Sequence, residues 1–114
     1  MSEYVPKRGD IVWVSLDPTK GHEQSGKRPV LVLSNTKYND KTGMMINAPI
    51  TNSIKRYVGE ILLPDSVKTA GAVLSDHIRN LDWVEREVDF KDDTVGDEFV
   101  DKVLERFNLI CSGN

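Results

Sequence analysis

The residues best suited to chemistry lie in a polar stretch from Asp17 to Pro29, between the apolar runs Ile11–Val14 and Val30–Leu33. A loop longer than a hairpin turn in a small domain tends to carry function. Arg28 stands at the mouth of the second apolar run. A guanidinium held at a strand edge can bind a phosphate through two parallel hydrogen bonds.

Two further side chains extend this hypothesis of phosphate chemistry. Thr51 ends a later apolar run, and its hydroxyl could orient a phosphate oxygen. Glu23 could accept a proton or hold Arg28 in place. Taken one residue at a time, structural roles are the more common: a surface cation for Arg28, a strand-ending residue for Thr51 and a solvated carboxylate for Glu23.

Several other chemistries lack their motifs. His22 and His77 lie far apart in the sequence, and the single Cys111 cannot build a zinc cluster. The glycines form no phosphate-binding fingerprint, and no serine lies in a nucleophile elbow. We therefore expect no metal and no cofactor. His77 is expected to satisfy a local hydrogen bond, and Trp13 and Trp83 to pack in a core or interface.

The elements that would position these residues are mostly strands. Apolar, β-branched runs bounded by turn residues predict a series of short strands, with a short helical turn or loop at 35–42 and an acidic segment leading to Asp93. The expected strands are Gly9–Leu16, Pro29–Ser34, Met44–Thr51, Tyr57–Leu63 and Gly71–Ser75, with a shorter element at Ile78–Val84. Pro29–Ser34 is apolar on both faces, which is typical of a central strand.

A helix is expected at the end of the chain, with Thr94 as a candidate cap. Its apolar face recurs at helical spacing in Phe99, Val103, Leu104, Phe107 and Ile110. Short strands followed by one terminal helix predict a mainly β fold, a small and partly open barrel. With 114 residues, a single domain over 1–114 is expected.

Composition narrows the class of protein. One cysteine and no basic-then-apolar leader predict a reducing cytoplasm, and no apolar run approaches membrane-spanning length. The net charge is -3, but residues 1–60 hold nine Lys and Arg against six Asp and Glu, whereas residues 61–114 hold six against twelve. This asymmetry suggests a basic face and an acidic face. From charge alone, simple solubility is the preferred explanation.

Several ordered blocks of the sequence carry a family resemblance. The blocks are Tyr4-Val5-Pro6, Gly9-Asp10-Ile11-Val12-Trp13-Val14, Asp17-Pro18-Thr19-Lys20-Gly21-His22-Glu23-Gln24, Arg28-Pro29-Val30-Leu31-Val32-Leu33-Ser34, Tyr38-Asn39, Lys41-Thr42-Gly43, Ala48-Pro49-Ile50-Thr51 and Leu74-Ser75-Asp76. Together they resemble the MazF/PemK family of bacterial toxin endoribonucleases. The similarity is collinear to Trp83 and weaker beyond it. Several ordered blocks are far more specific than one short motif.

The resemblance implies a strongly twisted, Src-homology-3-like β-barrel of the CcdB/MazF toxin type, assembled as a homodimer. It implies metal-independent, sequence-selective cleavage of single-stranded RNA, chiefly messenger RNA. The family's catalytic pair corresponds to Arg28 and Thr51, and its loop glutamate to Glu23. Many relatives have Gln after the aspartate that matches Asp76, where this chain has His77, a difference that bears on base preference and pH response.

The implied reaction is attack of a ribose 2′-OH on the adjacent phosphorus, leaving a 2′,3′-cyclic phosphate and a 5′-OH. Because the nucleophile is intramolecular, proximity lowers the barrier without a metal. Arg28 would stabilise the pentavalent anion, and Thr51 would hold a non-bridging oxygen. The general base stays open between Glu23 and Arg28, although a guanidinium with a pKa above about 12 is a poor base at neutral pH.

The substrate and partner surface is expected around the loops at 17–27 and 52–56. The candidate substrate-binding residues are Lys20, Gln24, Lys27, Asn52, Lys55, Arg56, Asp76 and His77. Their cations would contact phosphates of an unstacked single strand, with the acidic half of the chain facing away. An acidic, MazE-like antitoxin segment would cover the same surface.

Two alternatives from other classes remain at this stage. One is a CcdB-like poison that binds DNA gyrase without cleaving anything. The other is a nuclease-dead barrel that serves as a binding module. Retention of both Arg28 and Thr51 favours the nuclease.

Overall fold

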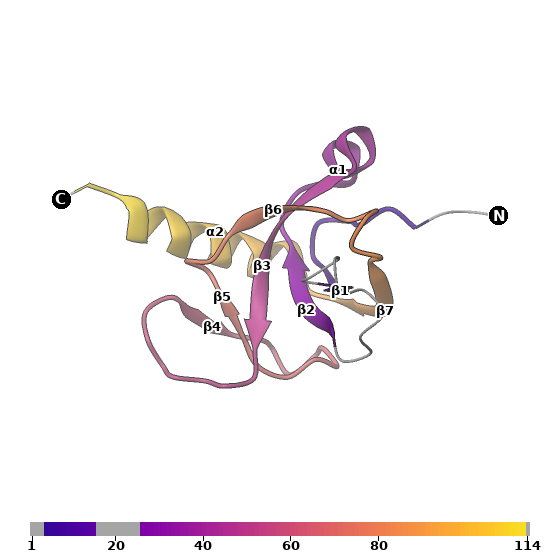
Figure 1. Cartoon of the computed structure of the whole chain (residues 1–114). Coiled ribbons are helices and arrows are strands. Elements are labelled where there is room, and N and C mark those ends of the chain that lie inside the picture. Colours follow the sequence, from indigo (N-terminus) through magenta and orange to yellow (C-terminus); the bar gives the residue numbers. More distant parts are fainter. Residues whose placement is uncertain (1–3, 16–25, 114) are drawn as a thin grey trace.

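The computed structural model describes residues 4–15 and 26–113. Within these ranges the chain forms seven strands and two helices (Figure 1). In chain order they are β1 (Asp10–Ser15), β2 (Lys27–Val32), α1 (Thr36–Thr42), β3 (Met44–Thr51), β4 (Glu60–Leu62), β5 (Ala72–Leu74), β6 (Arg79–Asp82), β7 (Asp89–Thr94) and α2 (Asp97–Cys111). None of the helices in the described ranges is long and apolar enough to cross a bilayer.

The strands form one antiparallel sheet in the order β4-β5-β3-β2-β1-β7, and β6 pairs with the first half of β3. The terminal strands of this order, β4 and β7, are not paired with each other in the described part of the chain, so the barrel is partly open. β2 lies centrally, between β1 and β3. The prediction of a mainly β fold with a C-terminal helix is confirmed.

Alternate residues of the central strands face two different cores. Ile11 and Leu31 belong to a buried cluster that is completed by Val100 and other residues of α2. Val12 and Val30, one position along each strand, belong to a second cluster with side chains of β3 and β6. This separation follows from the two-residue period of a strand and explains why β1 and β2 are apolar on both faces.

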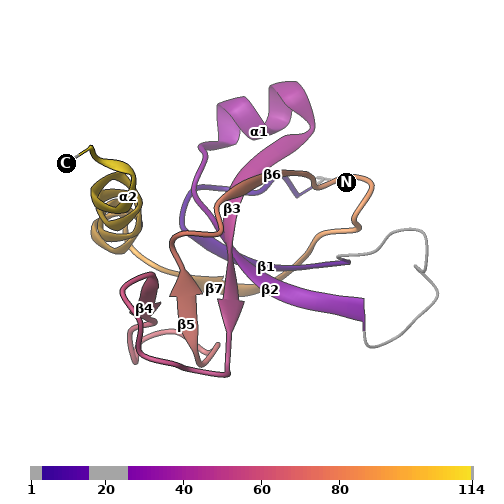
Figure 2. The ribbon, with the colours of Figure 1, turned by 60° about the vertical axis from the view of Figure 1, so that its left-hand side comes forward.

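β3 divides its hydrogen bonds between partners on its two edges. On one edge the ladder with β2 ends where Val30 lies opposite Pro49. On the other edge the last residue of β3, Thr51, pairs with Ala72 of β5. Pro29 and Pro49 have no backbone N–H to donate, so the β2–β3 ladder cannot continue in the same way. Beyond that point the start of β2 and the arrowhead of β3 spread apart (Figure 2).

The acidic segment before the last helix is a strand, which the sequence did not predict. β7 pairs with β1, and only Phe90 within it is a large apolar residue; its ring stacks on Tyr4 with the centroids 4.8 Å apart. The register shifts between Asp10 opposite Thr94 and Val12 opposite Phe90, so β7 carries a bulge. The pairing is therefore made by backbone hydrogen bonds that hydrophobic periodicity does not reveal.

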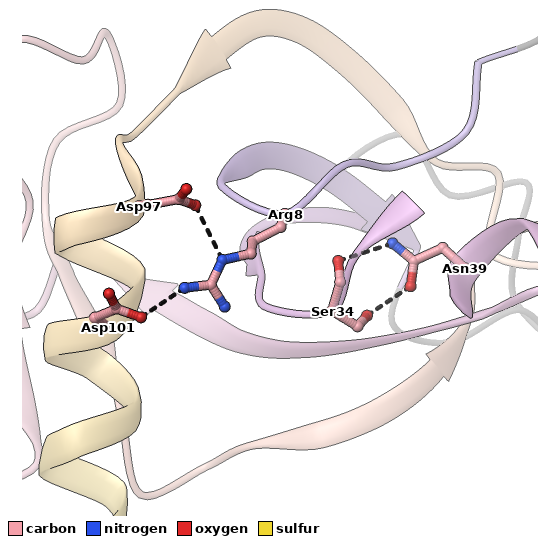
Figure 3. Close-up of polar contacts among 5 residues, drawn as sticks. All are labelled: Arg8, Ser34, Asn39, Asp97 and Asp101. Atoms are coloured by element: carbon pink, nitrogen blue, oxygen red, sulfur yellow. Dashed lines mark hydrogen bonds and ion pairs between the residues drawn. The ribbon is translucent and has the colours of Figure 1, made fainter. Parts of the chain in front are cut away.

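The terminal helix begins later than expected. Its N-cap is Gly96, and Thr94, the candidate cap, is instead the last residue of β7. Asp97 and Asp101 in the first turns form ion pairs with Arg8, at 3.0 and 2.6 Å (Figure 3). These contacts fix the N-terminal part of α2 against the start of the sheet.

The short helix α1 is fixed by a buried asparagine. Asn39 is completely buried, and its Nδ2 donates to the carbonyl oxygens of Pro6 at 2.8 Å and Ser34 at 3.1 Å. Its Oδ1 accepts a hydrogen bond from the Ser34 hydroxyl (Figure 3). The backbone oxygen of Asn39 also accepts from the indole of Trp83. One side chain thus joins α1, the N-terminal segment and the end of β2.

We expect Asn39→Ala to lower the free energy of unfolding by about 1–3 kcal/mol, because buried polar groups lose their partners. Denaturant unfolding measures the change. Asp40→Ala, at the exposed neighbouring position of the same helix, is the matched control. Equal unfolding midpoints for the two variants would contradict this role for Asn39.

Candidate functional site

A groove of about 700 Å³ opens where β2 and β3 separate. It is lined by residues of β1, β2, the end of β3, the segment 68–70 and β7. Arg28 and Thr51, the two residues singled out for phosphate chemistry, both line it. The divergence of the two strands therefore brings together side chains that lie 23 positions apart in the sequence.

Arg28 is available to bind an anion. It lies in β2 opposite Val14 of β1, and its side chain is exposed. Its guanidinium makes no hydrogen bond or ion pair with any residue of the described ranges. Because Arg28 lines the groove and has no acceptor among the described residues, its N–H donors of fixed geometry suit bidentate binding of a phosphate.

Thr51 is held on both sides. Its Oγ1 accepts a hydrogen bond from the backbone N–H of Ser53 at 3.0 Å, which leaves its own O–H to donate into the groove. Gly71 adopts a φ of +128°, and a Cβ there would lie 2.3 Å from the Thr51 carbonyl oxygen. Only glycine permits this approach, so Gly71 allows β5 to pair with the end of β3. Asn52 follows and also lines the groove.

A buried carboxylate fixes the opposite wall. Asp93 is 5% exposed and accepts hydrogen bonds from the backbone N–H of Lys68 at 2.9 Å and of Thr69 at 2.9 Å. It also accepts from the Thr69 hydroxyl at 2.7 Å. Burial alone would raise the pKa of Asp93, but these hydrogen bonds outweigh it and hold the pKa below its ordinary value. Asp93 therefore stays ionised and anchors the segment 68–70 to β7.

The charge of the groove differs from that of the whole chain. Arg28, Lys68 and Lys91 line it, and Asp93 is the one carboxylate on its described lining. The Lys91 ammonium lies 5.0 Å from the centroid of the Trp13 ring. The expectation that the second half of the chain faces away is thus wrong for this groove, because Lys68, Lys91 and Asp93 all come from that half.

Comparisons with known proteins identify the family of the chain. The family described as "PemK-like, MazF-like toxin of type II toxin-antitoxin system" matches residues 7–111. The chain belongs to this family. The chain is 39% identical over 110 residues to the endoribonuclease toxin MazF of Escherichia coli K12, which covers 96% of this chain and 97% of that one. It is 32% identical over 110 residues to endoribonuclease EndoA of Bacillus subtilis, covering 92% and 93%.

Solved structures of the family have the same fold. MazF of Deinococcus radiodurans superposes with a TM-score of 0.82 at 38% identity, covering 95% of this chain and 97% of that chain. A MazE–MazF complex from the same organism gives a TM-score of 0.83 at 32% identity, covering 98% and 100%. The expected barrel of the MazF toxin type is confirmed, and family membership favours the nuclease toxin over the CcdB-like poison.

Not all the residues expected to bind substrate line this groove. Lys27 precedes Arg28, but its ammonium donates to the carbonyl oxygen of Glu87 at 2.8 Å. Lys55 and Arg56 are exposed and do not line the groove. Their backbone N–H groups donate to the carboxylate of Glu60, the first residue of β4, so an acidic side chain lies against this loop. Lys20, Glu23 and Gln24 lie outside the described residues.

Asp76 and His77 form a separate cluster in the β5–β6 turn. The Tyr57 hydroxyl donates to Asp76 Oδ1 at 2.7 Å, and His77 Nε2 lies 3.8 Å from the same oxygen. Partial desolvation, together with this bond and the charge of Asp76, raises the pKa of Tyr57 to about 12. Gly59 makes the cluster possible, because a Cβ there would lie 2.4 Å from Asp76 Oδ1.

The residues of the opposite wall were missed by sequence reasoning. Lys68 lies in a connection, Lys91 and Asp93 lie in a segment interpreted only as acidic, and Trp13 was assigned to packing. Their common feature is proximity across the fold, which no spacing along the chain records. In the described part of the chain, no group of three or more His, Cys, Asp and Glu side chains could hold a metal ion.

We expect Asp93→Asn to lower the free energy of unfolding by about 1–3 kcal/mol at pH 7, because an amide cannot accept all three hydrogen bonds. The folded-state pKa of Asp93 is depressed, so its contribution is present above the unfolded pKa of about 3.9 and is lost as the pH falls through the folded value. The gap between wild type and variant should therefore narrow below about pH 4. Urea unfolding across pH measures it.

Asp92→Asn is the matched control for this experiment. Asp92 is the exposed neighbour of Asp93, and its φ of 64° suits asparagine as well as aspartate. Its substitution should change stability by less than about 0.5 kcal/mol. A pH-independent gap for Asp93→Asn, or an equal loss in both variants, would count against the role assigned to Asp93.

Proposed function

We propose that this chain is the toxin of a type II toxin–antitoxin system and acts as an endoribonuclease on single-stranded RNA, including messenger RNA. The observation that carries the proposal is the groove itself. An arginine and a threonine whose side chains donate no hydrogen bond to any described residue line one groove, which carries three cations and one carboxylate on its described lining, in a member of a toxin family. Relatives of nearly full length are named endoribonucleases.

The reaction proposed is a transesterification within the RNA strand. The ribose 2′-oxygen forms a bond to the adjacent phosphorus as the bond from phosphorus to the 5′-oxygen breaks. The 2′-OH loses its proton, and the departing 5′-oxygen gains one, which gives a 2′,3′-cyclic phosphate and a 5′-OH. Arg28 binds the oxygens that gain negative charge, and the Thr51 hydroxyl donates to a non-bridging oxygen.

The general base is assigned to Glu23 in this proposal. Asp93, the carboxylate on the described lining, is poorly suited because three hydrogen bonds occupy it and depress its pKa. Arg28 has a guanidinium that stays protonated at neutral pH. Glu23 precedes Arg28 by five positions in the sequence and carries a carboxylate.

The remaining candidate residues would extend the RNA surface beyond the groove. Asn52 lines the groove beside Thr51. The others proposed to contact RNA are Lys20, Gln24, Lys27, Lys55, Arg56, Asp76 and His77. A single strand is the natural substrate because sequence-selective recognition of RNA uses unstacked bases. We propose a cytoplasmic location, because messenger RNA is found there and a chain with a single cysteine suits a reducing compartment.

The proposed protein partner is a cognate MazE-like antitoxin. A solved MazF relative forms a complex with MazE. An acidic segment of such a partner would complement the three cations of the groove and exclude RNA from it. Inhibition would then result from competition for one surface.

Arg28→Ala and Thr51→Val should each lower RNA cleavage by about 100-fold or more, because each removes a contact to the charge that develops in the transition state. Both side chains lie on the groove wall outside the main cores, so the melting temperature should stay close to that of wild type. Cleavage is measured on single-stranded RNA in EDTA, and the cut ends are mapped.

Two results would refute the assignment. One is wild-type turnover in a well-folded Arg28→Ala protein. The other is unfolding, rather than inactivation, of Thr51→Val, which would make Thr51 structural. Lys41→Ala on α1, an exposed cation at the other end of β3, provides the control for loss of one positive charge (Figure 1).

We also propose a homodimer. Exposed apolar side chains gather near the C-terminal half of α2 and the β3–β4 connection, where Arg106 binds the carbonyl oxygen of Val58 at 2.6 Å. Val58, Leu62 and Leu109 are each more than half exposed. On the apolar face predicted for this helix, Phe99 packs against the first core cluster, whereas Ile110 is exposed.

Sedimentation of the wild-type protein at micromolar concentration should therefore give a dimer, and Leu109→Asp should shift it toward monomer, since it places a charge on apolar surface. Glu105→Lys, an exposed change of charge one turn earlier on α2, controls for charge alone. A wild-type monomer under these conditions would rule out the dimer.

A further inference from the structure

Two lysines of the groove form no ion pair with a carboxylate of the described residues. The Lys68 ammonium donates to the backbone carbonyl of Lys91 at 3.4 Å, and the Lys91 ammonium lies over the Trp13 ring. Neither forms an ion pair within the described ranges. Two like charges on one wall repel each other, and an anion between them would relieve that repulsion.

The backbone at each of these two lysines is fixed by local structure. Lys68 is fixed because Asp93 binds its backbone N–H and that of Thr69. Lys91 is placed by the bulge in β7, where Asp92 takes a φ of 64° that a non-glycine residue seldom adopts. Bulges of this kind often redirect side chains beside functional sites. A cation over the face of Trp13 gains about 0.5–1 kcal/mol, which favours an ammonium directed along the groove.

The carboxylate in this wall balances only part of the positive charge of the two lysines, since the charge of Lys68 is among the causes that lower the pKa of Asp93. Both oxygens of Asp93 already accept hydrogen bonds from Lys68 and Thr69, and the side chain is 5% exposed. Its role is therefore to shape the wall, whereas the exposed ammonium groups of Lys68 and Lys91 remain available to a ligand.

We propose that Lys68 and Lys91 form a subsite for a second RNA phosphate, next to the phosphate bound by Arg28 and Thr51. This rests on the proposed function. The four residues line the same groove, with Arg28 and Thr51 on the diverging ends of β2 and β3, and the lysines on the wall formed by 68–70 and β7. A groove of about 700 Å³ falls in the range that holds a drug-sized ligand, so it has room for a nucleotide as well as the scissile phosphate.

The subsite strengthens RNA binding and sets the position of the strand in the groove, and it takes no part in the cleavage step. Substrate long enough to reach it should bind more tightly than substrate that ends at the scissile phosphate. Removing the lysines should abolish this advantage of length while leaving the chemical step to Arg28 and Thr51. Asp93 acts on the subsite only as a positioning residue, through the backbone of Lys68.

The test compares the double variant Lys68→Ala, Lys91→Ala with Lys37→Ala, Lys41→Ala. The control removes the same charge from exposed positions of α1, which both ribbon views place away from the arrowhead of β3 (Figures 1 and 2). Binding is measured by fluorescence anisotropy with single-stranded RNA that carries a 2′-deoxy nucleotide at the mapped cleavage position. Kinetics are measured on the cleavable strand and on a series shortened one nucleotide at a time from either end.

The groove variant should bind about tenfold more weakly than wild type, as expected for loss of a charge-assisted contact. The slope of log Kd against the logarithm of salt concentration should become smaller by about 0.7, the value for one phosphate of a single strand. KM should rise, and kcat should stay within about threefold of wild type. Lys68→Arg, Lys91→Arg should restore the salt slope, which a packing defect would not allow.

Each outcome has a definite consequence. If wild type cleaves RNA but the groove variant matches the control in salt slope and in its response to substrate length, the subsite is overturned and the nuclease stands. If wild type neither binds nor cleaves single-stranded RNA, the proposed function fails and the subsite fails with it. Should the alanine variant fold poorly, Lys68→Gln, Lys91→Gln removes the charges and keeps the side-chain stems.

Discussion

The groove depends on the point at which β3 changes partners. The ladder between β2 and β3 ends at Val30 opposite Pro49, and the next two residues of β3 pair with β5 on the other edge. Two prolines at this junction remove the N–H groups that would hold the strands together. Separation of the two strands opens the space that Arg28 and Thr51 line. An interruption in backbone pairing thus produces a concave surface in the sheet.

The elements and residues on either side of this junction were largely predictable from the sequence. β3 occupies the predicted range Met44–Thr51, because a long apolar run between turn residues leaves little choice of limits. Arg28 and Thr51 were selected for what their side chains can do at strand ends, and both line the groove. The resemblance to the toxin family reinforced this selection, since it links residues that local patterns treat separately.

The opposite wall could not be predicted for a physical reason. β7 lacks the alternating apolar residues by which strands are recognised in a sequence. Backbone pairing and the buried carboxylate of Asp93 hold it in place instead. The interpretation of charge along the chain was also wrong for this wall. Summing charges over sequence halves assigned the second half to an acidic face, whereas Lys68 and Lys91 lie in the groove. Net charge by segment says little about a surface that four strands and a connection build together.

The short segment 68–71 links the two halves of the site mechanically. At one end, Asp93 accepts the backbone hydrogen bonds of Lys68 and Thr69. At the other end, Gly71 lies against the Thr51 carbonyl at a distance that excludes any side chain. Four residues therefore connect the wall of lysines to the threonine of the proposed catalytic pair. A displacement of this segment would move Lys68 and the contact with Thr51 together, so the proposed phosphate subsite and the proposed catalytic threonine share one piece of backbone.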